Sequence, residues 1–204
     1  YEKFDKIEHQ YFNPEELDND REREHRRRVY EMAMVKIPEQ EPVRVPFKQS
    51  AIVAQTVPEE NWETKGFNSL RRTGHLPDDI SEKDRGRVLD RLRRAKNWAR
   101  DYAPEEYVYE INYELPEEVK EQLSQEEKEA AEILAEMLET ESWEDQDDLD
   151  GKIFDIKEES ELRTGDFFTS IYKMILSREN GPRLSRLIIS IGSEDSAEIL
   201  RQAS

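Results

Sequence analysis

Apolar residues recur every three or four positions along most of the 204-residue chain, which is the periodicity of a helix with one buried face. In the clearest example, Ser81 and Asp84 form a capping box at the start of the segment. Its apolar face consists of Val88, Leu92, Ala95 and Ala99. The pattern therefore predicts a helix over about 81–100, with several arginines outside the apolar face.

Proline and glycine separate this helix from others along the chain. Residues 1–11 read as an amphipathic helix, and a second helix is expected to start at Asn13 or shortly after, because Asn is a good N-cap and Pro14 suits a first turn. The apolar stripe of this second helix is Val29, Met32 and Val35. Three prolines between 38 and 46 then exclude a helix. Further helices are predicted at 47–57, 59–72, 147–157 and 164–178, after Ser124, and on both sides of Gly192.

Two segments depart from the helical pattern. Aromatic and polar residues alternate between 107 and 113, which allows a short strand or an extended connection. The acidic sequence ESWEDQDD at 141–148 is predicted to form a loop. We therefore expect an all-α fold with little or no sheet, and divide it into the parts 1–45, 46–115 and 116–204.

The charge of the chain is acidic and unevenly distributed. The formal net charge is −18, yet the stretch 101–150 alone holds 20 Asp or Glu against two Lys. In the stretch 71–100, ten Lys or Arg face five Asp or Glu. Both stretches fit solvated helix faces. The alternative is that 71–100 faces phosphate groups while the acidic stretch points away from RNA.

The chain offers few side chains for catalysis. It has no cysteine, which excludes thiolate nucleophiles and sulfur metal sites and fits a reducing, cytosolic setting. A glycine-rich phosphate loop, an HExxH motif and a GxSxG motif are also missing. No apolar run approaches the ~20 residues that cross a bilayer. We predict a cytoplasmic, monomeric protein with no catalytic residue, no metal site and no membrane partner. Because Tyr1 stands inside an amphipathic pattern, we also expect a longer parent protein.

Aromatic residues close to arginines are the remaining chemical signal. Trp98 lies one helical turn after Arg94, so the two side chains could form a stacking platform beside a phosphate contact. Trp98 could equally anchor its helix in the core, because large aromatic side chains usually pack. The same choice between core and stacking applies to Phe167, where the core is favoured by the apolar pattern of the helix.

Helix ends supply the other candidates. His75 follows Gly74 beside Arg71 and Arg72, where its ring could stack on a base or stay inert in a loop. Arg183 begins a helix, and the free N–H groups of a first turn together with a guanidinium favour an anion.

Four blocks of the sequence resemble the class I lysyl-tRNA synthetases, in the same order. They are YEKFDKIEHQYF, PVRVPF, RRTGHLPDDISEKDRGRVLDRLRRAKNWARDYAPEEY and FFTSIYKMILSRENGPRLSRLIISIG. Together they span nearly the whole chain. The related glutamyl-tRNA synthetases share the last block more loosely, and their turn typically lacks an arginine at the position of Arg183.

The resemblance implies an all-helical anticodon-binding region, ending in a helical cage at 116–204, that follows a catalytic domain. The HIGH and KMSKS motifs, which handle ATP in that family, are absent here, as are the cysteines of a zinc-binding insertion. The resemblance therefore implies that ATP and zinc belong to the parent's catalytic part. The implied partner is lysine tRNA, contacted by Arg71, Arg72, His75, Arg94, Trp98, Phe167 and Arg183. The rival interpretation is an acidic helical scaffold that binds proteins and not RNA.

Overall fold

The computed structural model describes residues 2–77, 79–140, 143 and 146–203. Within these ranges it contains eleven α-helices, two short 3-10 helices and no strand, which confirms the all-α prediction for the described residues. The extended segment after Tyr107 is a connection. Most of the loop predicted at 141–148 lies outside the described residues, although its last residues already belong to a helix.

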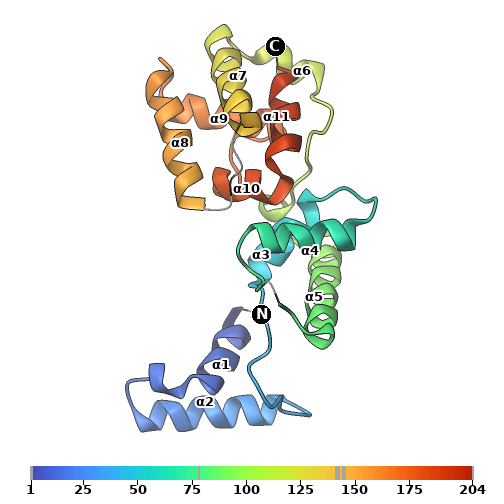
Figure 1. Cartoon of the computed structure of the whole chain (residues 1–204), viewed down its shortest axis with the longest axis vertical. Helices are drawn as coiled ribbons and strands as arrows, with labels where there is room; N and C mark the ends of the chain where they lie inside the picture. The colour runs from blue at the N-terminus through green and yellow to red at the C-terminus, as the bar shows by residue number, and fades with distance from the viewer. Residues whose placement is uncertain (1, 78, 141–142, 144–145, 204) are drawn as a thin grey trace.

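The helices follow one another in three groups along the long axis of the molecule (Figure 1). The first group is a hairpin of α1 (Glu2–Phe12) and α2 (Asp20–Ala33). The middle group contains α3 (Phe47–Thr56), α4 (Trp62–Arg72) and α5 (Glu82–Asp101). The last group contains α6 (Glu117–Gln122), α7 (Gln125–Thr140), α8 (Gln146–Glu159), α9 (Thr164–Leu176), α10 (Leu184–Ile191) and α11 (Ser193–Arg201).

The hairpin is held together by an aromatic cluster. Tyr30 of α2 is fully buried, and its ring centroid lies 4.5 Å from that of Tyr11 and 5.8 Å from that of Phe4, both on α1. Of the predicted stripe, Val29 is half-buried, but the rest is wrong, because Met32 is 86% exposed and Val35 lies beyond the end of α2, fully in solvent. The rest of α2 is rich in Arg and Glu, and Tyr30 is its one buried residue.

The middle group confirms the pattern predicted for α5. Val88, Leu92, Ala95 and Ala99 are all buried. The Ser81 hydroxyl accepts a hydrogen bond from the Asp84 backbone N–H at 3.1 Å and caps the helix. This face packs mainly against α3, and the arginines of α5 lie outside it.

The turn after α4 has the geometry that ends many helices. The His75 N–H donates to the Leu70 carbonyl at 3.0 Å and the Gly74 N–H to the Arg71 carbonyl at 2.9 Å, which is a Schellman motif. Gly74 has φ of +68°, in the left-handed region. The predicted helix stop is therefore confirmed, and it fixes the positions of Arg71, Arg72 and His75.

Gly74→Ala should lower the free energy of unfolding by about 1 kcal/mol, because a Cβ is disfavoured in the left-handed region. No heavy atom lies within 4 Å of the added Cβ, so the cost would be conformational alone. Gly86→Ala is the matched control, since Gly86 is exposed inside α5 with equally open space, and alanine there should stabilise the helix. Thermal unfolding of both variants measures the difference. If both substitutions changed the free energy of unfolding by the same amount in the same direction, the left-handed conformation assigned to Gly74 would be contradicted.

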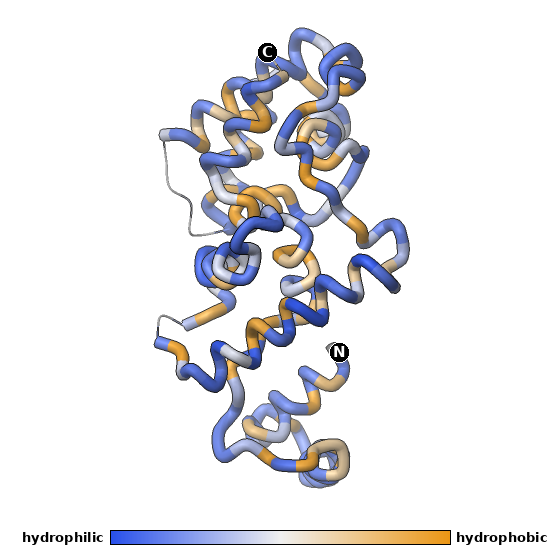
Figure 2. Tube along the Cα trace, turned by 90° about the vertical axis from the view of Figure 1, so that its right-hand side faces the viewer, coloured by the Kyte–Doolittle hydropathy of each residue, from blue (hydrophilic) through white to orange (hydrophobic). Residues whose placement is uncertain are grey.

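The last group surrounds the largest hydrophobic core, in which α7 packs along α11. Hydrophobic and hydrophilic positions alternate along these helices (Figure 2). α10 also contacts α3 and α4 of the middle group. At this junction the buried Ser69 hydroxyl donates to the Ser190 carbonyl at 2.8 Å. The middle and last groups are therefore joined by direct packing.

Candidate nucleic-acid interface

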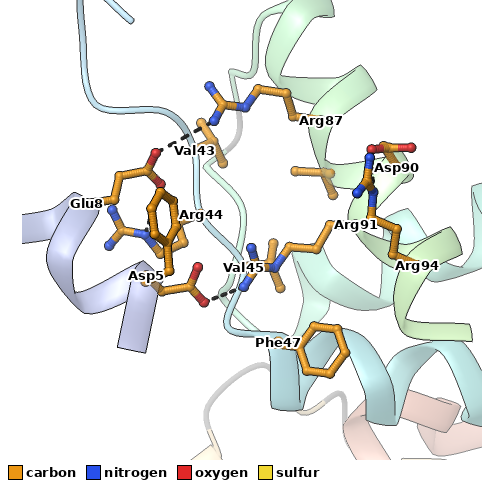
Figure 3. A pocket seen from close by; sticks show the side chains of 12 residues that line it. Asp5, Glu8, Val43, Arg44, Val45, Phe47, Arg87, Asp90, Arg91 and Arg94 are labelled. Carbon is orange, nitrogen blue, oxygen red and sulfur yellow. Dashed lines mark hydrogen bonds and ion pairs between the residues drawn. The ribbon is translucent and has the colours of Figure 1, made fainter. Parts of the chain in front are cut away.

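The predicted site residues lie in three different places. The first is the face of α5 that looks toward α1, where Figure 3 shows arginines around a hollow of about 270 Å³. Arg87, Arg91 and Arg94 reach it from α5, and Arg44 reaches it from the link between α2 and α3. Successive turns of one helix therefore place three guanidinium groups on the same side.

Carboxylates of α1 neutralise the inner part of this face. Arg91 forms an ion pair with Asp5, and Glu8 lies 3.8 Å from a guanidinium nitrogen of Arg87 (Figure 3). Arg44 approaches the same Glu8 carboxylate at 3.6 Å. Both carboxylates are buried, so these contacts attach the hairpin to the middle group. The positive charge that remains for a ligand lies at the outer end of the row.

Arg94 stands at that outer end. Its side chain is 64% exposed, and its Nε donates to Asp90 at 2.9 Å one turn earlier on the helix. An exposed pair of this kind is weak, because solvent screens both charges. Phosphate could therefore compete with Asp90 for this guanidinium, as the sequence prediction requires.

Trp98 lies one turn further along α5 and is half-buried. Its ring meets Phe47 at 5.4 Å and 75°, and Tyr107 at 6.4 Å. The ring also covers the small side chains that join α3 to α5. Trp98 thus anchors the helix with part of its surface and leaves another part at the wall of a second hollow.

The second place is the end of α4, where Arg72 has a structural contact. Its guanidinium donates to the carbonyls of Ile189, Ser190 and Ile191 at 3.3–3.5 Å. These are the carbonyls at the end of α10, which need donors and attract positive charge. We therefore leave Arg72 out of the RNA site. Arg71 is exposed and its guanidinium lies 5.4 Å from the centre of the Phe67 ring.

His75 lies beside this end of α4 with its ring half-buried. Its Nδ1 is 3.0 Å from the Thr73 hydroxyl. Burial of the ring, and then the positive charge of Arg186, lower the pKa of His75 below its ordinary value. The lowered pKa favours the neutral ring, which suits stacking more than a charge contact with phosphate.

An NMR titration should place the midpoint of His75 below 6.5. The unfolded chain then binds a proton that the folded chain does not, so stability falls as the pH drops below ~6.5 toward the lower folded-state pKa. Arg186→Gln should raise the pKa, because it removes the neighbouring positive charge. A midpoint at or above 6.5 in the wild-type chain would refute the assignment.

The third place surrounds the start of α10. Arg183 is 52% exposed, but it pairs with Asp147 at 3.2 Å and with Asp150, both on α8. These partners belong to the acidic stretch, which folds back onto the helix start and neutralises the predicted anion site. Phe167 is fully buried in the largest core. The prediction that its ring stacks on a base is wrong, because no part of the ring reaches the surface.

Sequence reasoning missed the residues that surround Trp98. Phe47 lies 51 positions before it, and the packing of α3 on α5 brings the two rings together. No local pattern could have revealed this pairing. The described residues contain no group of three or more acidic or histidine side chains placed to hold a metal ion, and no described helix is long and apolar enough to span a membrane.

Comparison with known proteins identifies relatives over nearly the whole chain, whereas no family model matches it. The chain is 34% identical over 206 residues to the lysine--tRNA ligase of Methanopyrus kandleri, with 97% of the chain aligned. It is 33% identical over 191 residues to that of Pyrococcus horikoshii and 31% identical over 202 residues to that of Natronomonas pharaonis, with 94% and 98% of the chain aligned. In each case it spans 35% of the relative's length. The chain is thus homologous, over nearly its whole length, to about a third of a lysine--tRNA ligase.

Proposed function

We propose that this chain recognises the anticodon stem-loop of lysine tRNA, and that ATP-dependent charging with lysine takes place in another part of the same enzyme. The observation that carries this proposal is the outer end of the α5 face. There the exposed guanidinium of Arg94 lies one turn from the partly exposed ring of Trp98. A cation beside an aromatic ring is the pairing that binds unpaired nucleotides.

The net charge of −18 does not oppose this role. The acidic residues are concentrated between 101 and 150, and much of that stretch belongs to α6, α7 and the start of α8, in the last group. The α5 face lies in the middle group (Figure 1). RNA bound along α5 would therefore meet a surface less acidic than the chain's average.

The rival function, a protein-binding scaffold without RNA, has one observation in its favour. Met32 near the end of α2 and Val35 just after it are strongly exposed, and exposed apolar side chains are common in protein contacts. That surface lies on the hairpin and not on the α5 face. The two functions therefore predict sensitivity to different substitutions.

Arg94→Ala should raise the KM for lysine tRNA in the full-length enzyme while leaving kcat nearly unchanged, because the lost contact is made in binding. In direct binding to the stem-loop, a lost phosphate contact should reduce the salt slope by about one unit. Aminoacylation kinetics and binding at several salt concentrations measure the two effects.

Arg93→Ala is the matched control. Arg93 is the neighbouring arginine of α5 and pairs with Glu63 at 2.8 Å, in the direction of α4. Its loss should leave the KM for tRNA unchanged. If both variants charge lysine tRNA like the wild type, and Met32→Ser or Val35→Ser impairs the enzyme instead, the scaffold role replaces the RNA role.

A further inference from the structure

A hollow of about 620 Å³ opens beside Trp98, between α3, α5 and the connection after α5. It is lined by the aromatic residues Phe47, Trp98, Tyr107 and Tyr109 and by the basic residues Lys3 and Lys48. An alanine and an isoleucine of α3 complete it. These residues come from four separate segments, so the fold alone creates the site.

The arrangement of the rings leaves Trp98 open to a planar ligand. Its ring meets that of Phe47 at 75° and that of Tyr107 at 51°, so neither neighbour stacks flat on it. In the described part of the chain no cation lies over the Trp98 ring either. The Trp62 ring of α4 differs, because the Lys96 amine lies 4.6 Å from its centre. A flat ring from outside can therefore contact the exposed part of Trp98.

The charge of the wall distinguishes this hollow within an acidic protein. No Asp or Glu lines it, although 49 of the 204 residues are acidic. Four other hollows of the described chain each include a carboxylate, for example that of Asp5, Glu139, Glu129 or Glu59. Among the described residues, no carboxylate forms an ion pair with Lys3 or Lys48, and both residues are exposed. The hollow therefore combines an aromatic wall with two exposed lysines.

We propose that this hollow binds a single unpaired nucleotide of the tRNA, with its base against Trp98 and its phosphate between Lys3 and Lys48. This step rests on the proposed function and names the part of the RNA that the site takes. Aromatic rings bind the π-face of a base, and amines bind the negative charge of a phosphate. Every nucleotide has both features. The hollow should therefore tolerate any base but require that one be present.

Fluorescence of Trp98 tests the contact directly. Trp62→Phe and Trp143→Phe leave Trp98 as the single tryptophan of the 204-residue chain. Addition of lysine tRNA should quench its emission, because a stacked base contacts the indole. In the original background, Trp98→Ala should weaken binding about tenfold, while Trp98→Phe, which keeps an aromatic face, should retain most of the affinity. Lys48→Ala should weaken binding and reduce the salt slope by about one unit.

A set of tRNAs, each lacking one base, separates a nucleotide site from a structural role. Removing the base that occupies the hollow should weaken binding to the wild type and abolish the difference between wild type and Trp98→Ala. A loss on Trp98→Ala that is the same for every abasic tRNA would mean that the residue acts only through packing, and would overturn the proposal. Trp62 belongs to α4 and does not line the hollow, so Trp62→Ala should leave binding unchanged.

These measurements also distinguish the nucleotide-binding hollow from the RNA-binding role of the chain. If the wild-type chain binds tRNA with a salt dependence that Arg94→Ala reduces, yet Trp98 is not quenched, the hollow is wrong and the RNA role stands. If no RNA binds and charging is insensitive to Arg94→Ala as well, both proposals fail.

Discussion

Phe167→Ala should lower the free energy of unfolding by about 3–5 kcal/mol, the usual cost of removing a fully buried phenylalanine. Its ring has no exposed surface and lies edge-on to Phe168 at 5.2 Å within the largest core. The cost combines the lost burial with the cavity that neighbouring helices cannot fill. Urea unfolding followed by circular dichroism measures it.

Phe154→Ala is the matched control for this prediction. Phe154 is 51% exposed on α8 and meets Phe168 at 5.7 Å, so it has the same chemistry and shares a neighbour. Its replacement should cost less than about 1 kcal/mol, because little surface is buried. If Phe167→Ala instead unfolded like the wild type and weakened tRNA binding, the ring would be a base-stacking residue after all.

Arg72→Ala should lower the free energy of unfolding by about 1–2 kcal/mol. Charge-assisted hydrogen bonds contribute about 1.5–3 kcal/mol, and the partial exposure and long distances of these contacts reduce that value. The substitution removes the guanidinium from the last carbonyls of α10, although the Ser69 hydroxyl still donates to the Ser190 carbonyl. Binding of tRNA measured well below the unfolding transition should keep its salt slope.

Arg71→Ala is the adjacent control. Arg71 is exposed and its guanidinium lies 5.4 Å from the centre of the Phe67 ring, a contact worth about 0.5–1 kcal/mol at an exposed site. Its replacement should therefore destabilise the chain less. If Arg72→Ala reduced the salt dependence of tRNA binding and left the free energy of unfolding unchanged, Arg72 would belong to the RNA site.

The sequence predicted those elements whose causes are local. The cap and the apolar face of α5 depend on residues within a few turns, and so does the stop at Gly74. The stripe on α2 failed because the burial of Met32 and Val35 depends on whether another helix covers them, which spacing does not reveal. Most residues of the loop predicted at 141–148 lie outside the part of the chain that the structure describes.

The candidate site was harder to predict because its residues meet across long separations. Arg183 looked like an anion site from its place at a helix start, but Asp147, 36 residues earlier, reaches it in space. Arg72 was singled out for its charge, yet its partners lie 117–119 residues later. Trp98 was identified from its spacing to Arg94, whereas the rest of its hollow depends on the packing of α3 and of the connection after α5.

The position of α10 has a consequence for how the molecule loses its structure. Seven of its eight residues are buried, and it contacts α3 and α4 as well as α8 and α11. Opening either the middle group or the last group exposes the apolar surface of α10. The two groups should therefore open as one cooperative unit. The α1–α2 hairpin does not share that surface, because ion pairs and the link containing Arg44 attach it. It is therefore the part of the chain whose amide hydrogens can exchange through a separate, less costly opening, while the rest stays folded.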